Sequence, residues 1–533
     1  MVASERAGVR SRPARVACAH NSDPIFSRAK GPKDMMTSSR SGRFGVRTLA
    51  AVVLAASGAA THAQELAFRF EAATDQFTPL HSYAYAKIPG YKFFFGGISG
   101  QGLHSIPEAT GTVSFPLNVF NENVYMLDEG TNTLYSASIA SLSQANREML
   151  RFTTAQFVQI GDTLHLYVGY GALENGTQWT TKPSVMSVDL LAVKNAMLAS
   201  NPLNDSMFTM QASTQARVAG GIIVKLGDKF ALVGGSNFTG DYGLGVNQTN
   251  PFQNQYSRAI YIFDPAVSMT TAVESFFDAY AFRRRDGNVM PVTLPDGNGG
   301  TKPGFVYATG VFRNGFDIWE EPLLYGVGDS SVHFEQTFLQ KANQYETANV
   351  SLYSETLDTN RIVTFGGITY FFWDEKFGWF QDFSFPWTDQ VAEYSITNGQ
   401  FVMDSEIFLG RTPLPFTNTH MLLQPNIPHN ENGQVLLDDM PHNEILVGKI
   451  YGGLFAQEPS TSPVTFASST VYNVYMTVGV RGDVNKDGYV NFTDLNAILS
   501  QFGGPGFADM NLDGVVNFND LNVVLSNFGA SAQ

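Results

Sequence analysis

The stretch GIIVKLGDKFALVGG, from Gly221 to Gly235, contains the pattern that decides the fold. Two apolar runs flank the pair Gly227-Asp228, which suits the two-residue turn of a β-hairpin, and two glycines follow the second run. We therefore predict hairpins in which small residues end the second strand. The chain contains six such stretches, some of them looser copies, and they end at Gly97, Gly171, Gly235, Gly310, Gly367 and Gly453.

These stretches recur about every 71 residues, and after several of them another apolar strand ends at Asp128, Asp189 or Asp264. Units of four strands at a regular period are typical of the blades of a β-propeller. We therefore predict a mainly β fold in which residues 64–480 form one propeller of about six blades. Seven blades, or two β-sandwiches of about 200 residues each, are the alternatives that the spacing leaves open.

The two ends of this domain carry strands that match. We expect LAFRFEA, residues 66–72, to pair with VYNVYMTV, residues 471–478, and so to close the ring without an open sheet edge. In residues 188–198 and 273–282 the apolar period shifts toward 3.6, which predicts two helical insertions.

The glycines that follow the second strand of each unit resemble the blade pattern of kelch-type propellers. That family includes copper radical oxidases related to galactose oxidase, whose cofactor is a tyrosine bonded to a cysteine. The only cysteine of this chain, Cys18, lies in a segment that we expect to be removed on export. The resemblance therefore implies the fold without that oxidase chemistry.

Near the C-terminus, two segments 26 residues apart are almost copies: DVNKDGYVNFTDLNAILSQFG from Asp483 and DMNLDGVVNFNDLNVVLSNFG from Asp509. Each has oxygen-bearing side chains at loop positions 1, 3, 5, 9 and 12 and a glycine at position 6, and a backbone carbonyl serves as ligand at position 7. This is the pattern with which EF-hand loops bind a hard cation. We therefore predict two Ca²⁺ ions, held by Asp483, Asn485, Asp487, Tyr489, Asn491, Asp494, Asp509, Asn511, Asp513, Val515, Asn517 and Asp520.

Each loop is followed by apolar residues at helical spacing. We expect the small core of residues 481–533 to consist of Phe492, Leu495, Ile498, Leu499, Phe518, Leu521, Val524 and Leu525. Residues 481–529 resemble the type I dockerin module, whose two loop–helix repeats bind calcium and dock onto a cohesin partner. The resemblance implies that residues 481–533 are a small α-helical module that docks onto a cohesin-like or cell-surface protein.

Loop positions 10 and 11 depart from the dockerin pattern. They hold Phe492-Thr493 and Phe518-Asn519, where dockerins that bind well-studied cohesins usually have small hydroxyl residues. Calcium binding is therefore the safer of the two expectations.

Residues 1–63 have the pattern of an N-terminal extension followed by a signal peptide. Arg43 and Arg47 precede a small-apolar run at residues 49–60, and Ala63 supplies the small residue at the cleavage site. A run of about 12 residues is shorter than the roughly 20 that span a bilayer. We expect cleavage after Ala63, secretion or display at the cell surface, and a mature chain without a transmembrane segment.

The charge balance excludes one class of partner. The chain has 33 basic and 48 acidic residues, and cleavage would remove ten basic and three acidic ones, which leaves a net charge of −22. Because a nucleic-acid backbone attracts basic surfaces, we expect no nucleic-acid partner.

Few residues of the propeller indicate a binding site. Two histidines flank the first glycine pair and could reach one mouth of the channel, or simply bond to backbone. The Arg-Arg-Arg-Asp run at 283–286 could clamp a carboxylate or sulfate, or be a solvated loop. The candidate ligand-binding residues are therefore His81, His104, Arg284, Arg285 and Asp286.

The sequence contains no nucleophile motif, phosphate loop or His-x-x-Glu metal helix. We therefore expect a binding protein, with a glycan or a protein at the propeller face, rather than an enzyme. The aromatic stretch at 370–387 is a candidate for stacking on sugar rings. The alternative is a polysaccharide-active enzyme of hydrolase or lyase type, as dockerin-bearing proteins often are, and two carboxyl groups close together at the channel mouth would favour it.

Overall fold

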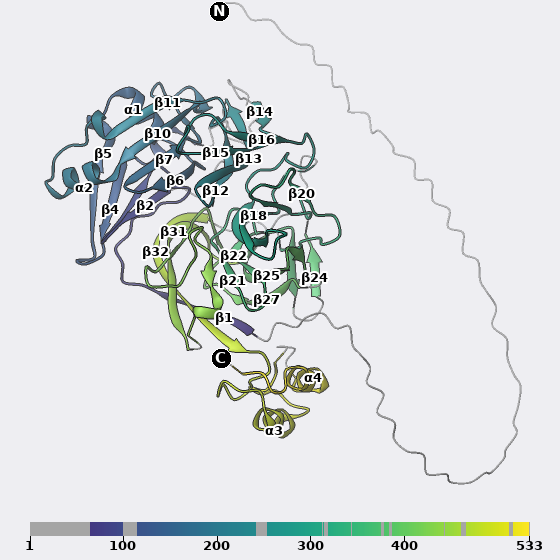
Figure 1. Ribbon diagram of the computed structural model, residues 1–533. Coiled ribbons are helices and arrows are strands. Elements are labelled where there is room, and N and C mark those ends of the chain that lie inside the picture. The colour runs from purple at the N-terminus through teal and green to yellow at the C-terminus, as the bar shows by residue number, and fades with distance from the viewer. Residues whose placement is uncertain are drawn as a thin grey trace, which may run out of the picture. The chain divides into compact units, whose positions relative to one another are not determined.

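The computed structural model describes residues 64–99, 115–240, 253–311, 313, 318–342, 344–374, 378–382, 386–403, 405–441, 443–459, 465–510 and 515–531 (Figure 1). The predicted signal peptide, His104, Asn511 and Asp513 lie outside these residues.

The described strands form a β-propeller arrangement of mostly antiparallel sheets, and six of these sheets contain four or more strands (Figure 1). The first sheet has the order β2 (Ala84–Ile88), β3 (Tyr91–Phe95), β4 (Asn123–Asp128) and β5 (Thr133–Ser138). The second has the order β6 (Gln156–Ile160), β7 (Thr163–Tyr167), β10 (Ser184–Asp189) and β11 (Phe208–Ala212).

The third sheet pairs β12 (Ala219–Leu226), β13 (Lys229–Thr239), β15 (Ala259–Phe263) and β16 (Glu274–Phe277) in succession. Its β13 also pairs with β14 (Gln253–Tyr256) and with β9 (Trp179–Thr181), which is the partner of β8 (Tyr170–Ala172). The fourth sheet has the order β17 (Asn288–Pro295), β18 (Thr301–Ala308), β19 (Leu323–Gly326) and β20 (His333–Phe334).

The fifth sheet pairs β30 (Val435–Leu436), β21 (Asn349–Ser354), β22 (Thr359–Ile368) and β25 (Trp387–Thr397), and β25 also carries β26 (Gln400–Phe401) and β27 (Ile407–Arg411). In the sixth, β28 (Phe416–Thr417) and β29 (Met421–Leu423) pair with β31 (Ile445–Ala456), which pairs with β32 (Thr465–Val480), and β32 pairs with β1 (Gln64–Ala72). A separate ribbon joins β23 (Phe371–Asp374) to β24 (Gly378–Gln381).

The helices in the described residues are short. They are α1 (Gln144–Leu150), α2 (Leu190–Leu198), α3 (Phe492–Gln501) and α4 (Phe518–Ser526), with 3₁₀ turns at Leu117–Val119, Ile139–Ser141, Asp205–Met207 and Leu437–Asp439.

The closing strand pair is present as predicted. β1 lies antiparallel to β32, and the register runs from Gln64 opposite Val480 to Ala72 opposite Tyr472. Two separate sandwiches would not join the two ends of the domain in one sheet. The pairing therefore confirms the closed arrangement over the sandwich alternative.

The glycines that end the second strands serve the close packing of the ring. Gly97 has a φ of +84°, and a Cβ on it would lie 2.5 Å from the carbonyl oxygen of His81. Gly235 has a φ of +83°, and its Cβ would lie 2.8 Å from the backbone nitrogen of Gly221. A residue with a side chain would therefore be both strained and in collision with the neighbouring strand.

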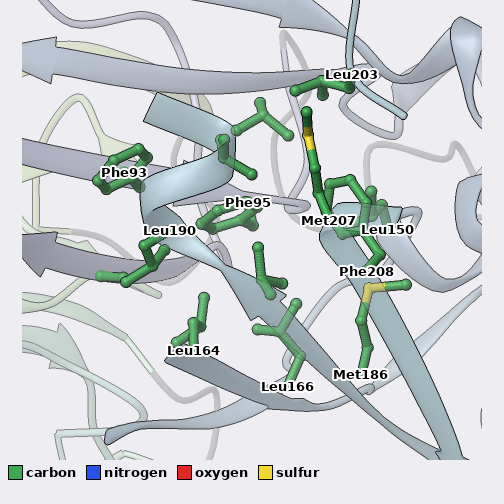
Figure 2. Packing of buried hydrophobic residues seen from close by; sticks show 14 of the residues in the cluster. Phe93, Phe95, Leu150, Leu164, Leu166, Met186, Leu190, Leu203, Met207 and Phe208 are labelled. Atoms are coloured by element: carbon green, nitrogen blue, oxygen red, sulfur yellow. The ribbon is translucent and has the colours of Figure 1, made fainter. Parts of the chain in front are cut away.

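The largest described core cluster lies between the first two sheets and is covered by α1 and α2 (Figure 2). Phe93 and Phe95 of β3 meet Leu164 and Leu166 of β7, and Leu190 of α2 packs over them. Burial of each such side chain contributes about 1.5–3 kcal/mol to folding.

One of the two predicted helical insertions is confirmed. Leu190–Leu198 is α2, and the Asp189 side chain caps it by accepting a hydrogen bond from the Ala192 N–H at 2.9 Å. The prediction for residues 273–282 is wrong, because Glu274–Phe277 is strand β16 on the edge of the third sheet. There Phe276 packs on Tyr325 while the next residue, Phe277, is exposed, which is the alternation of a strand.

The predicted core of residues 481–533 is only half right. Ile498 and Val524 are buried, and Leu495 and Leu521 pack against them. The other four predicted members, Phe492, Leu499, Phe518 and Leu525, are exposed. The core is completed instead by smaller residues that precede the helices in sequence; the buried ones are Val484, Val490, Ala508 and Val516.

We predict that β32 is required for the whole propeller. A chain truncated after Gln457 lacks the strand that joins β31 to β1, so two sheet edges and the core under them become exposed. This variant should be insoluble or should lose cooperative thermal unfolding, as followed by circular dichroism at increasing temperature. A chain truncated after Gly482 is the control and should unfold like the parent. Normal cooperative unfolding of the shorter chain would contradict the closure of the ring.

Candidate functional site

One backbone position recurs at the start of the first strand of each repeat. It has a left-handed φ, between +41° and +67°, and it lies at or just before β2, β6, β12, β17, β21 and β29. The residues at this position, which we call the channel ring, are Ser82, Thr154, Gly220, Asp286, Glu346 and Asn418.

Backbone hydrogen bonds join the members of the channel ring across neighbouring sheets. The amide of Asp286 donates to Gly220, that of Asn418 to Glu346, that of Ser82 to Asn418 and that of Gly220 to Thr154, at N···O distances of 2.7, 2.8, 3.0 and 3.5 Å. These bonds join Thr154, Gly220 and Asp286 in one group and Glu346, Asn418 and Ser82 in a second, although successive members are 60 to 72 residues apart in sequence. Members of both groups line the same cavities.

Two cavities lie against the channel ring, and both are lined by Ser82, Thr154 and Asn418. The larger has a volume of about 250 Å³ and is also lined by Gln156 and Glu346. The smaller has a volume of about 70 Å³ and is lined by His81, Arg285 and Asp286 among others. Because drug-sized ligands occupy about 300–1,000 Å³, the larger cavity suits a ligand of about one ring.

Aromatic rings form one wall of the larger cavity. Tyr85 lies 5.1 Å from Phe157 between ring centroids, and His420 lies 5.3 Å from each of them. Burial lowers the pKa of His420 to about 4, so this imidazole is uncharged at neutral pH. The wall is therefore apolar and uncharged.

Two carboxyl groups of the channel ring influence each other. Asp286 Oδ2 lies 2.8 Å from Nε of Arg285, and Glu346 Oε2 accepts a hydrogen bond from Asn418 Nδ2 at 2.5 Å. Burial raises the pKa of Glu346 to about 8, and the charge of Asp286 adds to this effect, whereas Arg285 and Asn418 oppose it. Burial also raises the pKa of Asp286. At neutral pH the pair therefore tends to hold a proton.

The structure brings three of the predicted ligand-binding residues together. His81, Arg285 and Asp286 all line the smaller cavity, and the ring Nδ1 of His81 is 3.0 Å from Oγ of Ser82. The fourth, His104, is outside the described residues.

Arg284 lines neither of these two cavities, and its side chain is packed inside the protein. Its guanidinium is completely buried, 4.3 Å from the ring centroid of Trp319, and it donates hydrogen bonds to the carbonyl oxygens of Ala281, Thr309 and Glu321. Arg283, its neighbour, lies over the ring of Tyr256 at 4.2 Å. The three arginines therefore do not form one anion clamp: only Arg285 reaches the channel.

The sequence reasoning missed Gln156, Glu346 and Asn418. The channel-ring position is held by six different residue types, so no motif marks it. The only signal was its distance, 15 to 35 residues, before the glycines that end the repeated stretches.

The first calcium loop is fully described, and its residues fit a hard cation. Position 6, Gly488, has a φ of +86°. Asp494 accepts hydrogen bonds from the amides of Asn485 and Asn491, and Asp483 accepts one from Gly488. Burial, and after it the carboxylates of Asp494 and Asp487, raise the pKa of Asp483. A divalent cation would relieve this repulsion.

The second loop repeats part of this geometry where it is described. Asp520 accepts a hydrogen bond from the amide of Asn517 at 2.8 Å, as Asp494 does from Asn491, but its second donor is the amide of Met510, at position 2, whereas that of Asp494 is Asn485, at position 3. Gathered groups of three or more His, Cys, Asp or Glu that could hold a metal are absent from the described residues. Half of each predicted ligand set is asparagine or backbone carbonyl.

Two aromatic pairs lie on the surface of the helices that follow these loops. Phe492 contacts Phe528 and Phe518 contacts Phe502, with ring centroids 4.9 and 5.0 Å apart. Phe492 and Phe518 occupy the same loop position, and they are 70% and 68% exposed. The duplication therefore gives two equivalent apolar patches.

The helices of the described residues include none that is long and apolar enough to cross a membrane. In comparisons with known proteins, no family model matches the sequence, and no curated protein matches it. The chain is similar to a solved structure titled "Structure of YjhT", which is 11% identical, with a TM-score of 0.41. The match covers 74% of this chain and 95% of that one. The propeller arrangement is established by the chain's own sheet order and by the pairing of β1 with β32.

Proposed function

We propose that the chain is an exported calcium-binding protein whose propeller binds a small polar ligand, with glycans as the first class to test, in its central channel. The observation that carries this proposal is the larger cavity, where an aromatic wall of Tyr85 and Phe157 faces a set of amide and carboxyl groups. Such a combination of apolar wall and few polar groups is typical of ligand sites.

We further propose that the six sheets are six blades of a kelch-type ring. The six members of the channel ring, one for each sheet, support this count. The left-handed glycine pairs that follow β3, lie within β13 and β22 and recur in β31 support the kelch resemblance.

Residues 481–533 would tether or dock the propeller. Calcium would be held by the oxygen ligands of the two loops and would supply the positive charge that their carboxylates lack. The exposed patches of Phe492 and Phe518 support docking to a partner protein, because aromatic side chains dominate protein interfaces. A cohesin-like or cell-surface protein is the class that we propose.

The second candidate function is a carbohydrate-active enzyme of hydrolase or lyase type. Asp286 and Glu346 favour it, because paired carboxyl groups with raised pKa values are typical of acid–base catalysis. A cavity of about 250 Å³ suits a small substrate or the end of a chain better than the middle of a polymer. Release of reducing ends from glycans that bind would favour this candidate.

The calcium proposal predicts two bound ions per chain. Isothermal titration of calcium-free residues 64–533 with CaCl₂ should give a stoichiometry of two. Asp483→Asn and Asp509→Asn should each remove one ion, because each replaces the first ligand of one loop. Asp439→Asn, at an exposed acid outside both loops, is the control and should bind two. If the variant that carries both Asp483→Asn and Asp509→Asn still binds two ions, the assignment is overturned.

The ligand proposal predicts that the aromatic wall contributes to affinity. Residues 64–533 should bind one or more compounds of a glycan array, and Tyr85→Ala should weaken binding of the best of them at least tenfold, or about 1.4 kcal/mol. Tyr280→Ala removes a tyrosine that is 54% exposed and outside the cavity, and it serves as the control. Equal affinities for the parent and the Tyr85 variant would place the ligand elsewhere on the protein.

A further inference from the structure

Two buried side chains of the larger cavity have acceptor atoms without a partner. Gln156 is 2% exposed, and its Nε2 donates to the carbonyl of Thr154 at 2.5 Å, while its Oε1 has no hydrogen bond within the described structure. Asn418 is 7% exposed, and its Nδ2 donates to Glu346, while its Oδ1 likewise lacks a described partner. Leaving such an atom unpaired costs about 1–3 kcal/mol.

Five side-chain donors that line the same cavity are turned toward the protein's own backbone. They bond to carbonyl oxygens of the neighbouring strands and loops, so they have little to offer a ligand. These donors are the hydroxyls of Tyr83, Thr347 and Thr419 and the side-chain amides of Asn288 and Asn349. These five donors are therefore occupied, whereas the acceptor oxygens of Gln156 and Asn418 are not.

The two carboxyl groups of the channel ring have one described arginine, Arg285, near them. Arg285 pairs with Asp286, and Glu346 is held by the neutral amide of Asn418. The other titratable groups that line the cavities or act on the pair are tyrosines and histidines: Tyr83, Tyr85, Tyr170, Tyr307, Tyr345, His81 and His420. Among them, burial raises the pKa values of Tyr83, Tyr85 and Tyr307 and lowers that of His420.

We propose that the channel binds a small organic cation with a primary ammonium group, whose N–H donors meet the acceptors of Gln156, Glu346 and Asn418. Its positive charge supplies, beside Arg285, a second counter-charge for the two carboxyl groups. The rings of Tyr85 and Phe157 cover its carbon skeleton, and aromatic faces also attract cations. This inference rests on the proposed ligand site in the channel and specifies its ligand class.

A metal ion fits the channel less well than an ammonium group. A hard divalent cation needs six or more oxygen ligands, with carboxylates prominent among them. Only one carboxyl group, that of Glu346, lines the larger cavity, and no acidic or histidine cluster of three occurs in the described part of the chain.

The test compares glucosamine with glucose, which differ by an ammonium group in place of one hydroxyl. Isothermal titration of residues 64–533 at pH 6.0, where the amine is protonated, should give at least tenfold tighter binding of glucosamine. Titrations in buffers of different ionisation enthalpy should show up to one proton released per glucosamine bound. The reason is the sign of the shift: the raised pKa of Glu346 means that the free site holds a proton at this pH, and a bound cation favours the ionised form.

Glu346→Gln keeps the shape of the side chain but cannot ionise, so it should bind glucosamine at least tenfold more weakly and release no proton. Glu458→Gln, at an exposed acid outside the cavities, is the matched control and should behave like the parent. Glucose binding as tightly as glucosamine would overturn the cation assignment while leaving ligand binding in the channel intact. If neither sugar binds at up to 10 mM while compounds of the glycan array bind in a way that depends on Tyr85, the cation assignment is also overturned. If no array compound binds either, the proposed ligand-binding function of the channel is overturned instead.

Discussion

The antiparallel pairing of β1 with β32 joins strands from the two ends of the domain, and the rest of the propeller depends on it. β1 contributes more than hydrogen bonds, because Phe68 and Phe70 pack edge-on against Phe365 of the fifth sheet, with ring centroids 5.1 and 5.6 Å apart. The closing strand is therefore fixed both within its own sheet and against the next one. A ring closed in this way leaves the first and last strands paired, so that only the short outer edges of the sheets remain.

Closure also creates the channel. Once the first strands of the repeats surround one axis, the residue that enters each strand must turn sharply, and the left-handed backbone lets its amide bond to the neighbouring repeat. Gly220 illustrates the constraint, because a Cβ there would overlap the carboxylate of Asp286. Carboxyl and amide groups that are far apart in sequence are thus held together out of water, where their mutual effects are strong.

The C-terminal residues, 481–533, have a different basis for their stability from that of the propeller. Their core is small, and much of the apolar surface of α3 and α4 remains exposed. The loops gather acidic oxygens instead, and capping boxes at Asn491 and Asn517 fix the starts of both helices. Stability there is expected to depend on a bound cation, and the exposed aromatic pairs are free to serve recognition.

The sequence by itself determined the features that depend on local patterns and on the near-repetition of segments along the chain. Turn pairs such as Gly227-Asp228 and the glycines at strand ends predicted the hairpins, and the matching end strands predicted closure, because period and turn chemistry are written in neighbouring residues. The helix at Leu190–Leu198 was also predictable, whereas the false helix at 273–282 shows that a short apolar period can be overridden by an available sheet edge.

Only the tertiary structure decided which side chains meet. His81, Arg285 and Asp286 were candidates from sequence, but their proximity to Asn418 and the influence of Asp286 on Glu346 arise from backbone hydrogen bonds between repeats. Arg284 and Arg285 are adjacent and chemically identical, yet one is buried against Trp319 and the other reaches the channel. Neighbours on an extended chain point to opposite sides, so the position relative to the ring axis, which no local motif encodes, assigns their roles.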